Sequence, residues 1–179
     1  MTARWKTIEP VYANQSRTVK TAHVLPPDTN HHGTMFGGKV SAYIDEVAAI
    51  AAARHCKQAV VTASMDSIDF LIPIKMGDAI TVEGVVTWCG RTSMEVFVKV
   101  TSENLSSGKR ELATVSFLTM VALDEERKPS PIPQVIPETE EEKYLHETAL
   151  ERREERTERK KQLSALQRAN RYLPENWRL

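Results

Sequence analysis

The sequence predicts an α+β fold in which an antiparallel β-sheet wraps around one long central helix, with a charged helix near the C-terminal end. Residues 37–55 place apolar or small side chains nearly all round a helical repeat, and such a helix is usually buried. Consecutive segments rich in Val, Ile, Thr and aromatic residues follow it and are typical of strands: 59–72, 79–89, 93–102 and 112–123. Wrapping these strands over the helix is the simplest way to bury it.

The composition narrows the classes of function. The 179 residues contain 24 Lys and Arg and 24 Asp and Glu, so the net charge is zero and gives no electrostatic reason to expect nucleic acid or an anionic membrane surface as a partner. Cys56 and Cys89 are the only cysteines and form no CxxC pair, so we expect neither a disulfide framework nor a zinc site, and a reducing cytoplasm fits. The N-terminus lacks an apolar stretch and no segment approaches ~20 apolar residues, so we expect neither secretion nor membrane insertion.

The residues before the long helix predict an arm and a first strand. Residues 1–16 are polar and irregular, which favours an N-terminal arm. Residues 17–25 alternate in polarity as a strand does, and the two prolines and the Asp-Thr-Asn cluster after them predict a loop. The main domain is therefore expected to span residues 17–124.

The composition changes beyond this domain. Residues 125–137 read as a proline-rich linker, and residues 138–179 as a helical tail. Thr139 and Glu142 have the spacing of a capping box, and the segment to about Gln167 is dense in Glu, Arg and Lys. It has no sustained heptad, so we expect a solvated helix that leans on the main domain at its ends, and not a coiled coil. The apolar residues after it are expected to dock on the main domain or on a neighbouring subunit: Tyr172, Leu173 and Trp177.

Asp45 stands out because it lies in the middle of the apolar helix. At about 100° per residue, its stripe contains only small neighbours, which are Gly38, Ser41, Ala48 and Ala52. Either another backbone packs closely there, or a ligand has room beside the carboxylate, or Asp45 is a surface acid. An unpaired buried carboxylate is costly, which disfavours a purely structural burial. Glu46 points to another stripe, where it can pair with a base or reach solvent.

Gly37 and Gly38 begin the helix and supply a second chemical element. A helix N-terminus presents N–H groups without partners and a partial positive charge, and glycine lets a ligand oxygen approach that backbone closely. This is how an oxyanion or a polarised carbonyl is held. Asn30, in the preceding loop, can orient a water or a carbonyl, or it can form a turn.

Other chemistries have weaker support. The sequence has no GxSxG, GxxxxGK[ST], HExxH or GxGxxG motif. His31 and His32 are adjacent in a loop, where they either form local hydrogen bonds or begin a metal site. Further metal ligands have no obvious source, so we expect no metal and no cofactor. Cys56, at a helix end, and Cys89, late in a strand, are poor candidates for a nucleophile.

Several motifs occur in one order along the chain. The first is N-x-x-G-x-x-F-G-G-x-x-x-x-x-x-D, from Asn30 to Asp45, and the others are ARHC (53–56), VVTASMDSIDF (60–70), SMEV (93–96) and PQVIPETEEEK (133–143). Together they resemble the hot-dog-fold acyl-CoA thioesterases, specifically the cytosolic acyl-CoA hydrolase branch. The resemblance covers residues 17 to about 140.

The resemblance implies a cytoplasmic enzyme that hydrolyses acyl-CoA to free fatty acid and CoA, with CoA as part of the substrate and no separate cofactor. Asp45 would be the general base or the nucleophile, and Asn30 would place the attacking water or the carbonyl. The N–H of Gly37 would hold the thioester oxygen. Ser64 aligns with a strand position that assists water placement in some relatives.

The resemblance also implies where CoA binds and how chains assemble. The CoA-binding residues would be Gly38, Arg91, Thr92 and Ser93, although Arg91 can equally be a hairpin arginine in solvent. Such enzymes share each active site across a dimer, with the Asp and the Asn from different subunits. The dimers commonly assemble further into trimers of dimers, which are hexamers.

Two other functions stay open on the sequence. A hot-dog dehydratase acting on acyl thioesters needs a histidine paired with the helix acid, and His31 or His32 could supply it. A non-catalytic acyl-CoA sensor would use the fold as a binding module, but sensors of that kind carry a helix-turn-helix, and no basic helical pair is present. The glycine pair and residues 60–70 favour the hydrolases.

Overall fold

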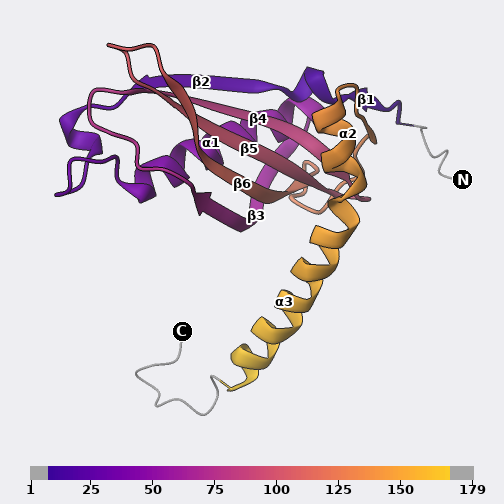
Figure 1. The fold of residues 1–179 in the computed structure, drawn as a ribbon. Helices are drawn as coiled ribbons and strands as arrows, with labels where there is room; N and C mark the ends of the chain where they lie inside the picture. Colours follow the sequence, from indigo (N-terminus) through magenta and orange to yellow (C-terminus); the bar gives the residue numbers. More distant parts are fainter. Residues whose placement is uncertain (1–7, 170–179) are drawn as a thin grey trace, which may run out of the picture. The chain divides into compact units, whose positions relative to one another are not determined.

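A computed structural model describes residues 8–169 of the chain (Figure 1). The elements in chain order are β1 (Val11–Tyr12), the 3₁₀-helix η1 (Ala13–Ser16), β2 (Thr18–His23), the 3₁₀-helix η2 (Pro26–Asp28), α1 (Gly37–Cys56), β3 (Ala59–Phe70), β4 (Ala79–Cys89), β5 (Ser93–Glu103), β6 (Arg110–Leu123), β7 (Val135–Ile136), α2 (Glu140–Glu147) and α3 (Ala149–Ala169). The chain divides into two units, Met1–His146 and Glu147–Leu179.

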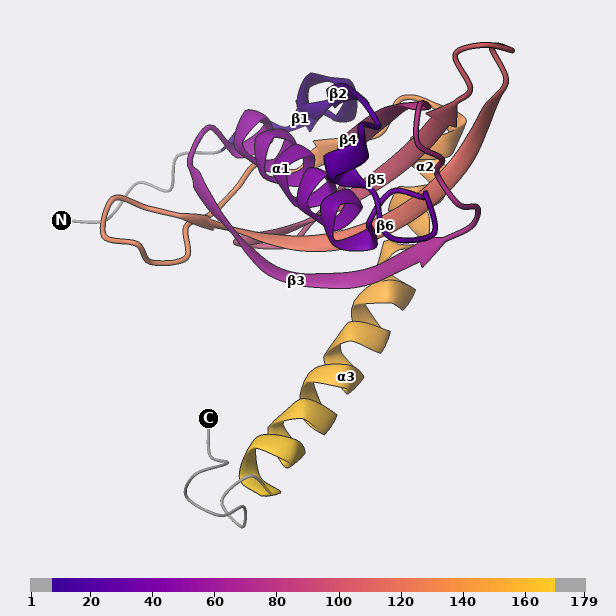
Figure 2. The same cartoon turned by 90° about the vertical axis from the view of Figure 1, so that its left-hand side faces the viewer.

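The first unit is a five-stranded antiparallel sheet with α1 across one face (Figure 2). The strand order is β2-β4-β5-β6-β3, so β2 and β3 are the two edges. The predicted arrangement, an antiparallel sheet around one long helix, is confirmed. Its physical cause is the apolar stripe of α1 that carries Val40, Ile44 and Val47, which is buried against the sheet. Ala42 and Ile50, on other stripes of the helix, stay exposed.

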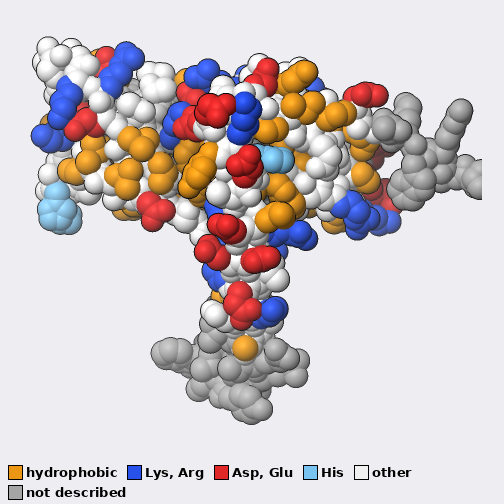
Figure 3. Space-filling view, turned by 45° about the vertical axis from the view of Figure 1, so that its right-hand side comes forward, with side chains coloured by type: hydrophobic (Ala, Val, Ile, Leu, Met, Phe, Trp, Pro, Cys, Tyr) orange, Lys and Arg blue, Asp and Glu red, His pale blue; other side chains and the backbone are white. Residues whose placement is uncertain are grey.

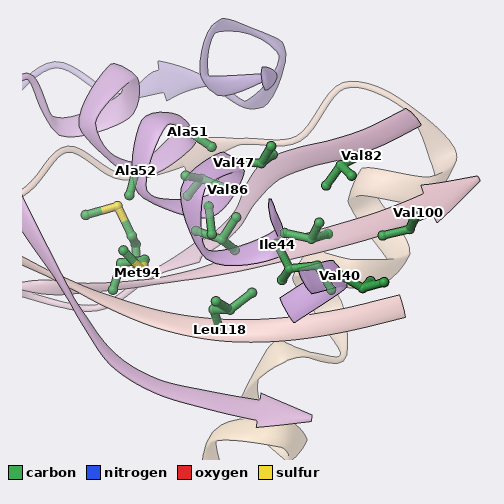
Figure 4. Packing of buried hydrophobic residues seen from close by; sticks show 14 of the residues in the cluster. Val40, Ile44, Val47, Ala51, Ala52, Val82, Val86, Met94, Val100 and Leu118 are labelled. Carbon is green, nitrogen blue, oxygen red and sulfur yellow. The ribbon is translucent and has the colours of Figure 1, made fainter. Parts of the chain in front are cut away.

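The core lies between α1 and the strand faces that point toward it (Figure 4). On α1 the spacing of Val40, Ile44, Val47 and Ala51 follows the helical repeat, and all four are fully buried. A Cβ on Gly84 would lie 2.8 Å from a Val47 methyl carbon, so glycine on β4 lets the helix approach the sheet closely. The strands contribute alternating side chains to the same core: Val82, Val86, Met94, Val100 and Leu118.

The described residues before β2, from residue 8 onward, do not form a separate arm. β1 pairs in parallel with β7, so that Val11 lies opposite Val135. Ser16 is completely buried, and its Oγ accepts a hydrogen bond of 2.9 Å from the N–H of Val86. The described part of residues 1–16 and the end of the predicted linker 125–137 therefore pair with each other within the first unit.

The described part of the predicted tail, up to residue 169, forms two helices, α2 and α3. The capping box is confirmed, since Thr139 Oγ1 accepts from the N–H of Glu142 at 3.2 Å and Glu142 Oε2 accepts from the N–H of Thr139 at 3.0 Å. α2 packs on the first unit through the Lys99–Glu141 ion pair of 2.9 Å and through buried Leu145. The unit boundary therefore follows His146, later than the predicted boundary at residue 138.

α3 belongs to the second unit and is polar, with acidic and basic side chains exposed along it (Figure 3). Lys161 and Glu158 form an ion pair of 3.1 Å across one turn, and Leu163 is half exposed. Tyr172, Leu173 and Trp177, predicted to dock, lie outside the described residues. None of the helices within residues 8–169 is long and apolar enough to cross a membrane.

Candidate active site

Asp45 projects from α1 toward the edge strand β3 and is half-buried. The hydroxyl of Thr62 on β3 donates a hydrogen bond of 2.7 Å to its Oδ1. No other polar partner of this carboxylate is found within residues 8–169, so Oδ2 is available to a ligand or a water. Ala42, one turn before Asp45 on the helix, is exposed, which leaves room beside the carboxylate.

Glu46, the neighbouring acid, has a different environment. Its carboxylate forms an ion pair with Lys20 on β2, at the opposite edge of the sheet from β3. The Lys20 ammonium also lies 4.1 Å from the centre of the Tyr43 ring. Glu46 thus pairs with a base, which is one of the two outcomes that the sequence allowed.

The start of α1 consists of two glycines. Phe36 is the N-cap residue and provides no side-chain cap, and within residues 8–169 the N–H of Gly37 has no hydrogen-bond acceptor. A Cβ on Gly38 would lie 2.4 Å from Phe36 Cε1, and a Cβ on Gly37 would lie 3.3 Å from Phe70 Cζ. Two phenylalanine rings therefore pack on the glycine pair, and the exposed donor points away from its own helix.

A hollow of about 350 Å³ adjoins this helix start. Its walls come from the loop before α1, the first turns of α1 and the chain after β3: Thr34, Met35, Gly37, Val40, Phe70, Leu71, Ile72, Pro73 and Ile74. Most of these side chains are apolar. The site thus suits a ligand with an apolar part that enters the hollow and a polar part that lies at the Gly37 backbone.

The side chain of Asn30 bonds within its own loop. Its Oδ1 accepts from the N–H of His32 at 2.9 Å, and its Nδ2 donates to Thr34 Oγ1 at 3.0 Å. No hydrogen bond joins Asn30 to Asp45 in the part of the chain that the structure describes. Within one chain, the Asn30 side chain therefore stabilises the turn of its own loop and does not reach the Asp45 carboxylate.

Ser64 faces away from Asp45. Its Oγ donates to Asp66 Oδ1 at 2.6 Å, and Asp66 also accepts from Thr119 at 2.7 Å. The pairing of β3 with β6 shifts between Thr62 and Ser64, and such a bulge turns the next side chain to the other face of the sheet. Sequence reasoning missed Thr62, because strand periodicity puts both residues on one face and the bulge leaves no clear signal in the sequence.

Of the residues predicted to bind CoA, Gly38 lies at the start of α1, whereas Arg91, Thr92 and Ser93 lie near its other end. Backbone hydrogen bonds tie the β4–β5 turn to β6 and to the chain before β7, since Thr92 O accepts from Ala122 N at 3.0 Å and Arg91 O accepts from Ile132 N at 3.1 Å. Pro133, next to Ile132, contacts His55 in the last turn of α1. A 20-residue helix is about 30 Å long, so one chain separates Arg91, Thr92 and the following Ser93 from Gly37 and Gly38. The Arg91 side chain is exposed.

His55 and Cys89 form a buried contact that does not suit nucleophilic catalysis. His55 Nε2 lies 3.0 Å from Pro133 O and 3.2 Å from Cys89 Sγ, and both side chains are almost completely buried. Burial lowers the pKa of His55 and raises the pKa of Cys89 to about 12. The thiol is therefore protonated at neutral pH, and the imidazole is neutral.

His31 and His32 are exposed in the loop of Asn30, with ring centres 3.8 Å apart. Among the described residues no group of three or more His, Cys, Asp or Glu side chains is placed to hold a metal ion. Both histidines belong to the loop of Asn30, and neither forms a hydrogen bond with Asp45.

Sequence comparisons place the chain in a family of enzymes. Residues 32–109 match the family model described as the thioesterase superfamily. An uncharacterised acyl-CoA thioester hydrolase of Bacillus subtilis is 56% identical over 92% of this chain and 95% of its own length. The cytosolic acyl coenzyme A thioester hydrolase of mouse is 40% identical over 82% of this chain, which spans only 42% of that longer protein.

Solved structures give the same result for the fold. A hexameric acyl-CoA thioesterase is 60% identical, with a TM-score of 0.83, over 85% of this chain and 97% of its own. The acyl-CoA hydrolase of Staphylococcus aureus, in complex with butyryl-CoA and CoA, is 45% identical, with a TM-score of 0.84, over 87% of this chain and 95% of its own. The S. aureus enzyme has also been solved with an Asp, an Asn or a Thr replaced by Ala. The predicted hot-dog fold and resemblance are confirmed, and the chain belongs to the thioesterase superfamily, among the acyl-CoA thioester hydrolases.

Proposed function

We propose that this protein is an acyl-CoA thioesterase that hydrolyses acyl-CoA to a free fatty acid and CoA, in the cytoplasm. The observation that carries the proposal is the Asp45 carboxylate, held through one oxygen by Thr62 and open at the other, on a helix whose start offers the unpaired N–H of Gly37. The names of its close relatives support the same activity.

The chemistry needs few groups because a thioester carbonyl is activated relative to an ester. The carbonyl oxygen accepts a hydrogen bond from Gly37 N–H, where the positive end of the helix stabilises the charge that develops on it. Asp45 takes a proton from a water that attacks the carbonyl carbon, the C–S bond breaks, and the CoA sulfur leaves and is protonated. Alternatively, Asp45 attacks directly and forms an anhydride that water then hydrolyses. Both routes give the same products.

We place Asn30 and Thr62 in the same site. The residues replaced in the S. aureus enzyme are an Asn, an Asp and a Thr, in this order and at intervals of 15 and 17 residues. Asn30, Asp45 and Thr62 have the same types, order and intervals. Thr62 would position the carboxylate, and Asn30 would orient the water or the carbonyl. The contact of Ser64 with Asp66 supports no role for Ser64 at this carboxylate.

We infer that two chains complete each site. Gly37 and Asp45 lie about 12 Å apart along α1, which favours a carbonyl held by Gly37 of one chain beside Asp45 of another. β3 is a 12-residue edge strand, and its outer row of backbone groups can pair with a second copy. Pairing two β3 strands about a two-fold axis would lay the α1 helices side by side in opposite directions.

This arrangement also explains why Arg91, Thr92 and Ser93 lie far from Gly37 within one chain and can still bind the same CoA. With the helices antiparallel, the Arg91 turn of one chain comes near the end of the α1 helix where its partner has Gly37 and Asn30. We therefore retain Gly38, Arg91, Thr92 and Ser93 as CoA contacts, with Arg91 for a phosphate. Three such dimers would make a hexamer, the assembly of a close structural neighbour.

The direct test is release of free thiol from acyl-CoA by purified Asp45→Asn. We expect kcat to fall ~10²–10⁴-fold with the protein still folded, because the change removes the base and keeps the shape. Glu46→Gln is the matched control on the same helix and should retain most activity, since Glu46 pairs with Lys20. Equal losses in both variants would refute the assignment of Asp45. A wild-type protein that binds acyl-CoA without releasing thiol would be a binding module, and a dehydratase would show activity only on a hydroxyacyl thioester.

A further inference from the structure

The hollow beside the start of α1 contains a residue of the proposed reaction centre. Gly37 lines it, and the other walls are mainly apolar, with Val40 from α1 and Phe70, Leu71 and Ile72 from the end of β3 and the chain after it. The acyl chain of a thioester begins at the carbonyl carbon. A carbonyl oxygen bonded to Gly37 N–H would bring one of the two substituents of the carbonyl carbon, the alkyl chain or the sulfur, to the mouth of this hollow, and the apolar walls favour the alkyl chain.

Building on the proposed function, we propose that this hollow binds the acyl chain of the substrate and that Phe70 is the residue that limits its length. The Phe70 ring is fixed against the reaction centre, since its Cζ lies 3.3 Å from the point where a Cβ on Gly37 would stand. A chain that leaves the carbonyl must pass along this ring.

The exposure of the wall fits an apolar occupant. Phe70 is 54% exposed and Leu71 is 53% exposed, although both are large apolar side chains beside a concave surface. Adjacent exposed apolar groups of this kind mark a binding surface more often than single scattered ones do. An alkyl chain in the hollow would cover both side chains.

Two other hollows of the first unit are charged and do not suit an alkyl chain. One of about 220 Å³ is lined by Lys75, Asp78, Lys109 and Glu111 among others. Another of about 230 Å³ is lined by acidic and basic side chains that pair with one another: Arg17, Glu83, Lys99 and Glu141. Neither contains Gly37 or Asp45.

The volume sets the class of substrate. A dry apolar cavity of ~150 Å³ accommodates benzene, so a hollow of about 350 Å³ corresponds to roughly a dozen carbons. Each buried methylene contributes at most about fourfold to kcat/KM by area transfer. We therefore expect kcat/KM to rise from butanoyl-CoA to octanoyl-CoA and to level off or fall near dodecanoyl-CoA, so that short- and medium-chain acyl-CoA are preferred.

The experiment measures kcat/KM for butanoyl-, octanoyl-, dodecanoyl- and hexadecanoyl-CoA with the full-length protein and its Phe70 variants. Phe70→Ala should raise the ratio of hexadecanoyl-CoA to octanoyl-CoA hydrolysis by about tenfold, and Phe70→Trp should lower it. A ratio is independent of the fraction of active protein. Phe97→Ala, the same change on the opposite face of the sheet, is the matched control and should keep the wild-type ratio.

The outcomes separate this inference from the proposed function. A wild-type protein that releases no thiol from any acyl-CoA refutes the proposed function itself. Active protein with an unchanged ratio in both Phe70 variants overturns the acyl-chain assignment alone, as does a wild-type preference of more than tenfold for hexadecanoyl-CoA. A changed assembly on size exclusion with an unchanged ratio would show that the hollow is a contact between copies of the chain.

Discussion

At the scale of single residues, the hydrogen bond from Thr62 to Asp45 fixes how the carboxylate is presented. One oxygen accepts from the hydroxyl, and the other remains available to a water or to the substrate. A carboxylate held in this way needs less reorientation when the substrate binds. In the proposed mechanism Thr62 therefore acts through Asp45, as a positioning residue.

Replacing Thr62 by Val should lower kcat by about tenfold and leave KM nearly unchanged, because the shape is kept and one hydrogen bond to a charged group is lost. Thr62→Ser keeps the hydroxyl and should recover most of the activity. Steady-state kinetics on both variants check this expectation. A Val variant with the kcat of the wild type would contradict the role of the hydrogen bond. A Ser variant as impaired as the Val variant would show that the methyl group is needed as well as the hydroxyl.

Individual site residues differ in how far the sequence can predict them. Asp45 could be found because a carboxylate among small side chains on an apolar helix contrasts with its surroundings. Gly37 and Gly38 are a weaker signal, since glycines at a helix start are also common for purely conformational reasons. Thr62 could not be separated from Ser64, because that choice depends on a bulge in β3 and bulges are set by tertiary pairing.

At the scale of elements, His55 joins the end of α1 to the chain before β7 through its contact with Pro133 O. Since a carbonyl only accepts hydrogen bonds, His55 Nε2 carries the proton, and Nδ1 is buried without a partner among the described groups. A second proton on Nδ1 would place an unpaired charge in the core. The contact between His55 and Pro133 O therefore requires a neutral imidazole.

The burial of His55 predicts how the free energy of unfolding depends on pH. Burial lowers the pKa of His55 in the folded protein, so below about pH 6.5 the unfolded chain takes up this proton first. The free energy of unfolding should therefore fall as pH decreases through that range, by at most about 1.4 kcal/mol per pH unit from this group. Denaturant titrations between neutral and mildly acidic pH should show a shallower dependence for His55→Gln. Equal slopes for the variant and the wild type would contradict this role of His55.

The elements themselves were predictable in unequal measure. The long helix and the four strands after it have strong periodicity over many residues, and all of them are present. The pairing of β1 with β7 involves two residues on each side, and nothing local in residues 11–12 indicates a partner far along the chain. α2 could not be assigned to the first unit, because its docking depends on Leu145 and on the ion pair with Lys99.

At the scale of the whole molecule, the proposed active sites are shared between chains. Within one chain Asn30 bonds to its own loop, Asp45 bonds to Thr62, and Arg91 lies near the opposite end of α1 from Gly37. A two-fold pairing along β3 would bring these separate groups into two composite sites. The sequence predicted this sharing only through its resemblance to a family, because no local pattern encodes a symmetry axis.

The most direct measurement mixes two inactive variants, Asn30→Ala and Asp45→Ala, under conditions in which subunits exchange. If each site takes Asn30 from one chain and Asp45 from the other, every hybrid dimer contains one intact site, and random mixing should restore about a quarter of wild-type activity. Each variant alone should stay inactive, and mass spectrometry of one isotopically labelled variant reports the extent of exchange. Complete exchange without any gain in activity would contradict the shared site and would mean that each chain supplies Asn30 and Asp45 to its own reaction centre.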